Sequence, residues 1–256
     1  TEFTDIVFHE TESVSLTESG NKLYGEDFRF TKTQNFTLNL PGYKIGSEIN
    51  AFTVFASKTS GAGSKLSFKA NDNTLVATSS DEIPSIDNSS FDLFRTGKTL
   101  KQFSLNGDLL TYHINYSSSG TILQANLDYI TINYTRNLEL NNSLRFRDSN
   151  AKGTTFEISN CNENTCVWDL SIPHFPVQLP GKLNGKKYSV TANSNGEYIA
   201  FNSSARHNSP TFVSKVANQN LHGEPTPDMI IISPNEYMSQ AQRVADLHLQ
   251  LDSMRV

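Results

Sequence analysis

The strongest constraint on the fold is a succession of short segments, rich in β-branched and aromatic residues, that fills residues 1–215 without a convincing helix. Turn-forming residues separate these segments, as they separate the strands of a sheet. We expect strands at Phe3–Phe8, Lys22–Phe30, Asn35–Leu40, Ala51–Ser57, Lys65–Ala70, Leu100–Leu105, Leu109–Tyr116, Ile122–Arg136, Thr154–Ser159, Cys166–Ile172, Lys187–Ala192 and Glu197–Phe201. The pattern predicts a mainly β protein, with an antiparallel β-sandwich of jelly-roll type over residues 1–215, as one domain or two subdomains.

Residues 127–134 alternate most clearly between the two faces of a strand. One face carries Leu127 and Tyr129 with two polar residues, and the other carries a carboxylate, two isoleucines and a tyrosine. Because each face mixes polar and apolar residues, the pattern leaves open which face is buried.

Residues 228–256 follow a different pattern. Asp228–Ile232 is a short apolar run of the kind that forms a buried parallel strand. A helix start follows, with Ser233 as the cap, Pro234 at the first helical position and Glu236 three residues after the cap. We expect the helix to continue to about Asp252.

The inward face of this helix is expected to carry a stripe that Met238 and Ala245 widen. The stripe consists of Tyr237, Ala241, Val244, His248 and Leu251. Residues 254–256 resemble the start of a second strand. Since a parallel strand needs neighbours, we expect residues 228–256 to be the first βα unit of an incomplete α/β domain, joined to the sandwich by a linker at 216–227.

The composition indicates an exported protein. Charged residues make up only 18% of the chain, and the formal net charge is −5. This charge offers nucleic acid no basic surface, so we expect no nucleic-acid partner. The abundance of Ser, Thr and Asn is typical of many secreted β proteins.

The two cysteines enclose a short segment between two expected strands. Cys161 and Cys166 could be brought within bridging distance by a tight hairpin, and a disulfide there would indicate an oxidising compartment. The alternative is a pair of free thiols. A metal site is not expected, because no second Cys or His pair lies at ligand spacing.

No glycine-rich phosphate loop or nucleophile elbow occurs in the sequence, so no cofactor is expected. The single tryptophan, Trp168, is interpreted as a core anchor, with a sugar-stacking platform as the alternative. Its neighbour Asp169 is expected to serve a turn or a hydrogen bond. Four histidines without partner spacing are interpreted as structural, namely His9, His113, His174 and His207.

Several segments carry a specific resemblance. They are Asn218–Gly223, Pro227–Pro234 and Gln240–Ala245, together with Leu127–Arg136 and Val167–Ser171 upstream. The first three resemble the beginning of the peptidase domain of gingipain-family cysteine peptidases, within that family most closely the sortases of the type IX secretion system of Bacteroidetes. Residues 1 to about 120 carry no resemblance of this kind.

The resemblance implies a parent protein on the extracellular face of the bacterial outer membrane. Such a sortase removes the C-terminal signal domain of exported cargo and joins the cargo to anionic lipopolysaccharide, through a cysteine that a histidine activates. In the family that histidine follows the third core strand, whereas His222 precedes the first, so we interpret His222 as a linker or interface residue. The catalytic His and Cys are expected beyond Val256, which predicts an inactive fragment of a cysteine endopeptidase or transpeptidase.

Three hypotheses for residues 1–215 remain open. The first is an accessory sandwich that positions or restrains its own C-terminal peptidase domain, or binds cargo proteins or outer-membrane secretion components. The second is a module that binds glycans or lipopolysaccharide. The third is a structural or adhesive surface domain.

Overall fold

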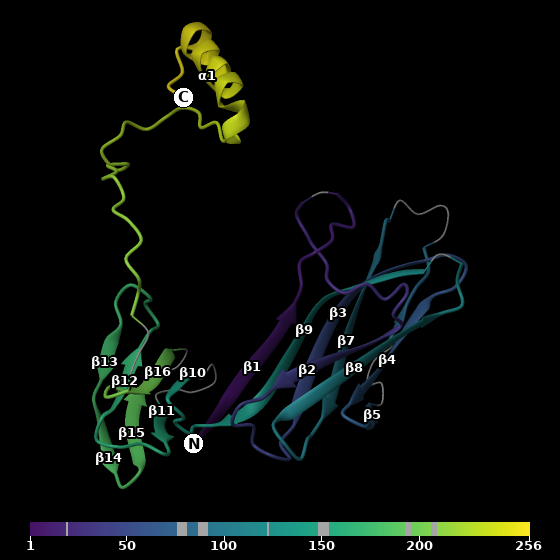
Figure 1. The fold of residues 1–256 in the computed structure, drawn as a ribbon, viewed down its shortest axis with the longest axis vertical. Coiled ribbons are helices and arrows are strands. Elements are labelled where there is room, and N and C mark those ends of the chain that lie inside the picture. The colour runs from purple at the N-terminus through teal and green to yellow at the C-terminus, as the bar shows by residue number, and fades with distance from the viewer. Residues whose placement is uncertain are drawn as a thin grey trace. The chain divides into compact units, whose positions relative to one another are not determined.

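The computed structural model describes residues 1–18, 20–75, 81–86, 92–121, 123–147, 154–192, 196–205 and 209–256. The chain forms two compact units, Thr1–Arg206 and His207–Val256. The first unit contains the described strands and two hydrophobic cores, and the second contains the described helices (Figure 1). The expected mainly β, antiparallel architecture is confirmed.

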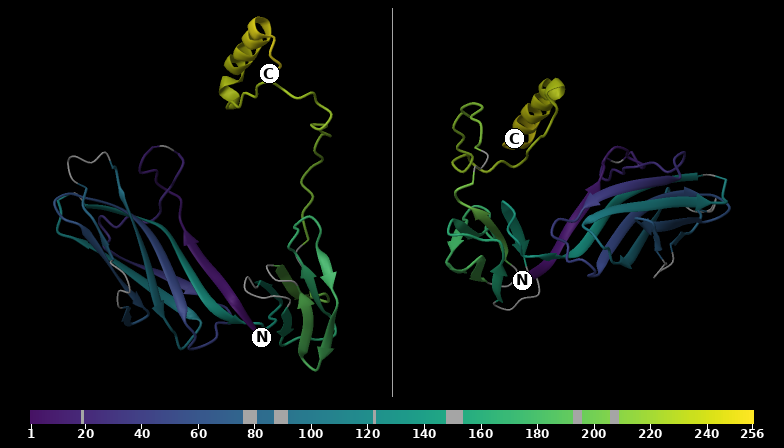
Figure 2. Two further views of the ribbon diagram at one scale, coloured as in Figure 1. Left: turned by 180° about the vertical axis from the view of Figure 1, so that it is seen from behind. Right: turned by 60° about the horizontal axis from the view of Figure 1, so that its bottom comes forward.

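The first core lies between two antiparallel sheets. One sheet has the order β1 (Glu2–Glu10), β9 (Leu123–Asn137), β3 (Ile49–Thr59) and β7 (Arg95–Phe103). The other has the order β2 (Thr33–Asn39), β8 (Leu109–Ser118), β4 (Ser64–Ala70) and β5 (Asn73–Leu75), with β6 (Glu82–Ile83) paired to β4. The strands are shown from two further sides in Figure 2.

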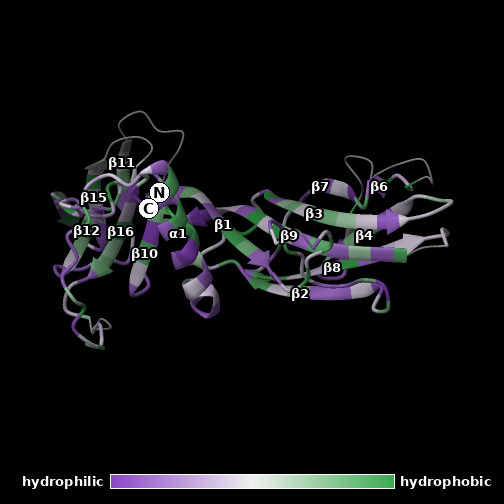
Figure 3. Ribbon diagram, turned by 90° about the horizontal axis from the view of Figure 1, so that it is seen from above, coloured by the Kyte–Doolittle hydropathy of each residue, from purple (hydrophilic) through white to green (hydrophobic). Residues whose placement is uncertain are grey.

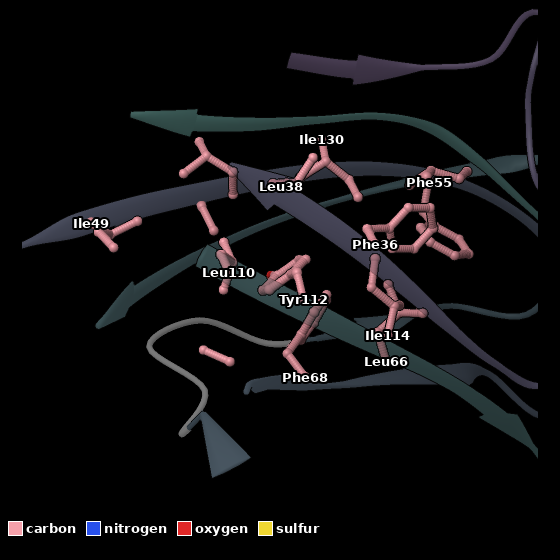
Figure 4. Close-up of a cluster of buried hydrophobic side chains, with 14 of the residues drawn as sticks. Phe36, Leu38, Ile49, Phe55, Leu66, Phe68, Leu110, Tyr112, Ile114 and Ile130 are labelled. Atoms are coloured by element: carbon pink, nitrogen blue, oxygen red, sulfur yellow. The ribbon is translucent and has the colours of Figure 1, made fainter. Parts of the chain in front are cut away.

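Alternation along these strands builds the first core. On β8, Leu110, Tyr112 and Ile114 are buried while the residues between them lie on the outer face. Leu66 and Phe68 on β4 point into the same cluster, as Figure 4 shows. Because side chains on a strand alternate in direction, one apolar residue in two is enough to fill a sandwich. The resulting bands of hydrophobic and hydrophilic residues are visible along the strands in Figure 3.

A β-bulge on β9 explains the mixed faces of residues 127–134. Val54 on β3 lies opposite Tyr129, but the next residue, Phe55, lies opposite Leu127. Asp128 is therefore the extra residue, and the side-chain direction reverses there. As a result Leu127 points into the same core as Ile130.

The second core lies between two smaller sheets of the same unit. One sheet has the order β10 (Ser143–Arg147), β16 (Glu197–Asn202), β12 (Thr165–Asp169) and β13 (Val177–Leu179), and the other has the order β11 (Thr154–Ile158), β15 (Lys187–Ala192) and β14 (Gly181–Asn184). Phe146, Phe156 and Tyr198 form its aromatic centre. Phe3 from β1 packs edge-on against Phe146, with the ring centroids 6.3 Å apart.

The chain passes from one small sheet to the other at Pro180, which lies between β13 and β14. Both strands are at the edges of their sheets. Pro180 has no amide hydrogen, so it can occupy this position without losing a ladder hydrogen bond.

One predicted strand, Lys22–Phe30, is wrong. This segment forms only isolated bridges, at Tyr24 and Asp27. The Asp27 carboxylate accepts the backbone N–H of Arg29 at 2.8 Å, and this local turn interrupts any regular ladder. Five observed strands, β5, β6, β10, β13 and β14, were not expected from the sequence, and each has five residues or fewer.

The terminal unit contains one main helix. A 3₁₀ turn, η1 (Asn235–Tyr237), precedes α1 (Met238–Asp252), so the predicted end at Asp252 is confirmed. The predicted cap is wrong, because the Ser233 hydroxyl donates to the carbonyl of Pro234 at 3.1 Å and caps no backbone N–H.

The predicted strand at residues 228–232 is also wrong. Residues 228–232 form no strand, since the described part of this unit contains no neighbouring strand with which they could form a ladder. The amides of Asp228 and Met229 instead donate to the carbonyl of Arg255, at 2.8 and 3.2 Å. Residues 228–229 and 255 therefore hold the two ends of the unit together.

Candidate interaction surfaces

The two cysteines do not form a bridge in this structure. Both are free thiols. Cys161 is buried in the second core, whereas Cys166 lies between the inward-facing residues Thr165 and Val167 and points to the other side of β12. Because successive residues on a strand point to opposite faces, the two thiols are directed apart.

The surroundings of Cys161 make its thiol unreactive. Burial raises the pKa of the thiol, although a hydrogen bond with Thr165 and one to backbone act in the opposite direction. The Sγ atom lies 3.5 Å from the carbonyl oxygen of Ile158. A buried thiol of this kind favours a structural role over nucleophilic catalysis.

Trp168 is not a core anchor. It lies on the outer face of β12, half-buried, with its ring centroid 5.6 Å from that of Phe201. The core position on this strand belongs to Val167. Asp169 serves a turn as expected, because its Oδ1 accepts the backbone N–H of Ser171 at 2.8 Å.

A row of aromatic rings crosses the outer face of the first sheet. The ring centroids of Phe8 on β1 and Phe52 on β3 lie 5.6 and 6.1 Å from that of Tyr129 on β9. Phe8 is 53% exposed. Beside the row, the Gln102 amide donates to Asn50 Oδ1 at 2.9 Å. The sequence does not predict this surface, because its three rings come from strands far apart in the chain and the pattern of residues 127–134 leaves open which face is buried.

The outer face of the second sheet of the first core is polar. A hollow of about 390 Å³ on this face is lined by Thr33, Ser67, Lys69, Asn71, Asp72, His113 and Asn115. A ring nitrogen of His113 lies 2.6 Å from Asn35 Oδ1, and the Asn115 amide donates to Thr33 at 2.6 Å. Five of the lining residues are alternate residues of the adjacent strands β2, β8 and β4, so the sheet spaces their hydrogen-bonding groups, and Asn71 and Asp72 come from the turn after β4.

Of the remaining candidate histidines, one lies beside a carboxylate and two are exposed. His9 Nε2 is 2.8 Å from Glu26 Oε1, whereas His174 and His222 are exposed. His207 lies outside the described residues. No cluster of three or more potential metal ligands occurs in the described part of the chain.

Helix α1 has two apolar faces. The segment at residues 227–231, which precedes the helix, covers only one of them. Ala241, Ala245 and His248 are half-buried, and a hollow of about 340 Å³ between the helix and residues 227–231 lies on this side. The predicted inward stripe is therefore divided. Val244 and Leu251 from that stripe remain exposed, and Val244 lines a second hollow with Leu247.

No described helix is long and apolar enough to cross a membrane. The sequence matches no family model, and no curated protein matches it.

The fold defines a class of protein module: a β region with two successive sandwich cores, followed by a small helical unit. A solved structure of this class is that of dimeric latent PorU from Porphyromonas gingivalis. The match has a TM-score of 0.80 and 24% identity, and it covers all of this chain. The chain spans 25% of the length of that PorU chain, so the match shows the fold of a PorU-like region.

Proposed function

We propose that this chain is the N-terminal, non-catalytic region of a gingipain-like cysteine peptidase. In this proposal the parent is a sortase on the extracellular face of the bacterial outer membrane, and it removes the C-terminal signal domains of type IX secretion cargo. The β region positions or restrains the peptidase domain. Cargo proteins and outer-membrane secretion components are its further partners.

The observation that carries the proposal is the full-length match to a quarter of the PorU chain. Two features of the molecule support it. The motif resemblance at residues 218–245 falls in the terminal unit, and α1 in that unit keeps Val244 and Leu247 exposed for a further packing partner. The buried, unreactive Cys161 supports a non-catalytic role for this part of the protein.

Peptidase assays on the parent protein and on residues 1–256 test the proposal. We expect the parent to cleave cargo that carries a C-terminal signal domain, and a thiol-alkylating reagent to stop the cleavage. Residues 1–256 are expected to release no product from the same substrate. The accessory role fails if the parent lacking residues 1–206 cleaves, folds and localises as well as the intact protein does.

The aromatic row on the first sheet supports a second candidate, a module that binds glycans or lipopolysaccharide. Sugar rings stack on exposed aromatic side chains, and the neighbouring amides of Asn50 and Gln102 could bind hydroxyl groups. Titration of the 256-residue chain with purified lipopolysaccharide tests this candidate. Binding that the Phe8→Ala substitution weakens at least tenfold would support it, and the absence of binding would reject it.

A further inference from the structure

A buried ion pair interrupts the otherwise apolar first core. The Lys101 ammonium lies 2.6 Å from Asp81 Oδ2, and the two side chains are 0% and 6% exposed. Lys101 is on β7 of one sheet, whereas Asp81 directly precedes β6, which pairs with β4 of the other sheet. The pair therefore spans the two sheets at the edge of the sandwich where β7 is the last strand.

Few groups in this core can stabilise the two charges. The Lys101 nitrogen lies 5.1 Å from the centroid of the Phe68 ring, and Asp81 Oδ1 is buried with no hydrogen-bond partner among the described residues. An ion pair in an apolar core loses the hydration of both charges, and the mutual attraction repays this only when the remaining polar atoms are bonded. The charged pair is consequently a costly arrangement, and a reaction that removes both charges is favoured.

Three buried residues with hydroxyl groups, Thr53, Thr99 and Tyr112, lie on strands of the same core. Thr99 lies two residues before Lys101 on the same face of β7, and its hydroxyl is buried with no partner among the described residues. Thr53 is opposite Thr99 in the sheet and lies 3.5 Å from the hydroxyl of Tyr112. Burial is the main cause that raises the pKa of Tyr112, and the nearby Asp81 charge adds to it, so its hydroxyl keeps its proton and can donate.

We propose that Lys101 and Asp81 condense into an intramolecular amide bond that joins the two sheets of the first sandwich. The proton of the ammonium passes to the carboxylate across the existing hydrogen bond. Nζ then forms a bond to Cγ of Asp81 and gives a second proton to Oδ2, and the bond from Cγ to Oδ2 breaks. One water molecule leaves with Oδ2, and the two opposite charges disappear together.

The position of the two groups favours this reaction. Groups held in contact by a fold react as if their concentration were about 10⁵ M or higher. Asp81 Oδ1 and the Thr99 hydroxyl are both buried without a partner among the described residues, and Tyr112 is close enough to sense the Asp81 charge. Hydroxyl donors that stabilise a developing negative oxygen are effective in a site without water. A lysine amine in an apolar pocket is also a better nucleophile than one in water.

Mass spectrometry of the intact, purified 256-residue chain tests the proposal. We expect a mass lower than that of the sequence by one water molecule, and a tryptic peptide in which Lys101 is linked to Asp81. The substitution Lys101→Met should restore the full mass. Lys98→Met, on the exposed side of the same strand, is the matched control and should retain the deficit.

The exposed pair of Lys44 and Glu2, with nitrogen and oxygen 2.7 Å apart, is an internal control that should remain unlinked. A folded wild-type chain that keeps its full mass after prolonged incubation would overturn the proposal. A deficit that persists in Lys101→Met, or that maps to other residues, would overturn it too. If Lys101→Met does not fold, the linked peptide of the wild-type chain decides the question alone.

Discussion

Phe146 is the residue on which the second core depends most. It is 2% exposed, and its ring contacts those of Phe3, Phe156 and Tyr198 at centroid distances of 6.3, 5.1 and 5.4 Å. We expect Phe146→Ala to lower the free energy of unfolding by about 3–5 kcal/mol, because it removes buried area and leaves a cavity. Urea unfolding measures the change. Phe175→Ala, at an exposed position, is the control and should change stability by less than about 0.5 kcal/mol.

The two thiols should differ in reactivity. We expect iodoacetamide to modify Cys166 first, because Cys161 is buried and its pKa is raised. The measurement is a time course of modification by mass spectrometry at about pH 8, close to the ordinary pKa of a thiol. Equal rates at both residues in the folded chain, or loss of both thiols through oxidation to a bridge, would contradict the structure.

For some residues the sequence predicts the local structure correctly, and for others it does not determine which way the side chain points. The strand at Leu109–Tyr116 was expected and is present as β8, and its alternation around Tyr112 is regular because one face is consistently apolar. The direction of Trp168 was not predictable, because Cys166, Val167 and Trp168 are all apolar and only the pairing of β12 with β16 decides which of them is inward. The contact of Lys101 with Asp81 depends on two strands of different sheets, which no local pattern encodes.

At the scale of elements, the bulge in β9 determines which residues of that strand enter the core. Deletion of Asp128 would remove the extra residue and leave a regular ladder, in which Tyr129 and Leu127 stay opposite Val54 and Phe55 and Leu127 still faces the core. We expect the deletion and Asp128→Ala to lower the free energy of unfolding by similar amounts, about 1–3 kcal/mol, because both remove the carboxylate that pairs with Lys22 and neither turns a core residue outward. Urea unfolding of the two variants measures the changes. A much larger loss for the deletion would show that the fold needs the extra residue itself.

The same bulge carries an ion pair that predicts a pH dependence. Asp128 Oδ2 lies 2.6 Å from the Lys22 ammonium, and this hydrogen bond raises the pKa of Lys22 above 10.5. A raised lysine pKa contributes stability that is complete below the unfolded pKa and is lost as the pH rises through the folded value. We expect the stability difference between wild type and Lys22→Met to stay constant from about pH 7 to 9 and to shrink above about pH 10.5. A difference that grows at high pH would contradict this assignment.

The shortest strands of the fold could not be predicted from the sequence. The strands β5, β6, β13 and β14 have two to four residues each, too few for an alternating pattern to be recognised. Helix α1 was predictable to its last residue because its apolar spacing extends over several turns. Its start was misplaced, since the Ser233 side chain bonds to a neighbouring carbonyl, a choice that the motif does not specify.

At the scale of the whole molecule, one apolar face of helix α1 in the terminal unit is exposed. Val244, Leu247 and Leu251 are 46%, 52% and 73% exposed. We expect the 256-residue chain to self-associate through this face, because contiguous apolar patches promote contact between molecules. Light scattering should detect the association, and a chain ending at Gly223 should lack it.

A pair of charge variants locates the association surface. Val244→Glu combined with Leu247→Glu should reduce the apparent mass to that of a monomer. The matched control, Ser239→Glu combined with Gln242→Glu, adds the same charge at exposed polar positions outside the hollow that Val244 and Leu247 line, and should leave the association unchanged. If both double variants behave as wild type does, another surface joins the molecules.

The proline between β13 and β14 has a consequence for how the protein behaves in a crowded solution. An unpaired sheet edge can recruit strands from other molecules and seed fibrils. Here the chain crosses between two sheets at Pro180, so both edges end after three or four residues, and Lys182 adds a positive charge to one of them. An incoming strand would find too few amides to bind at these two edges, so β13 and β14 are poor starting points for an amyloid-like stack.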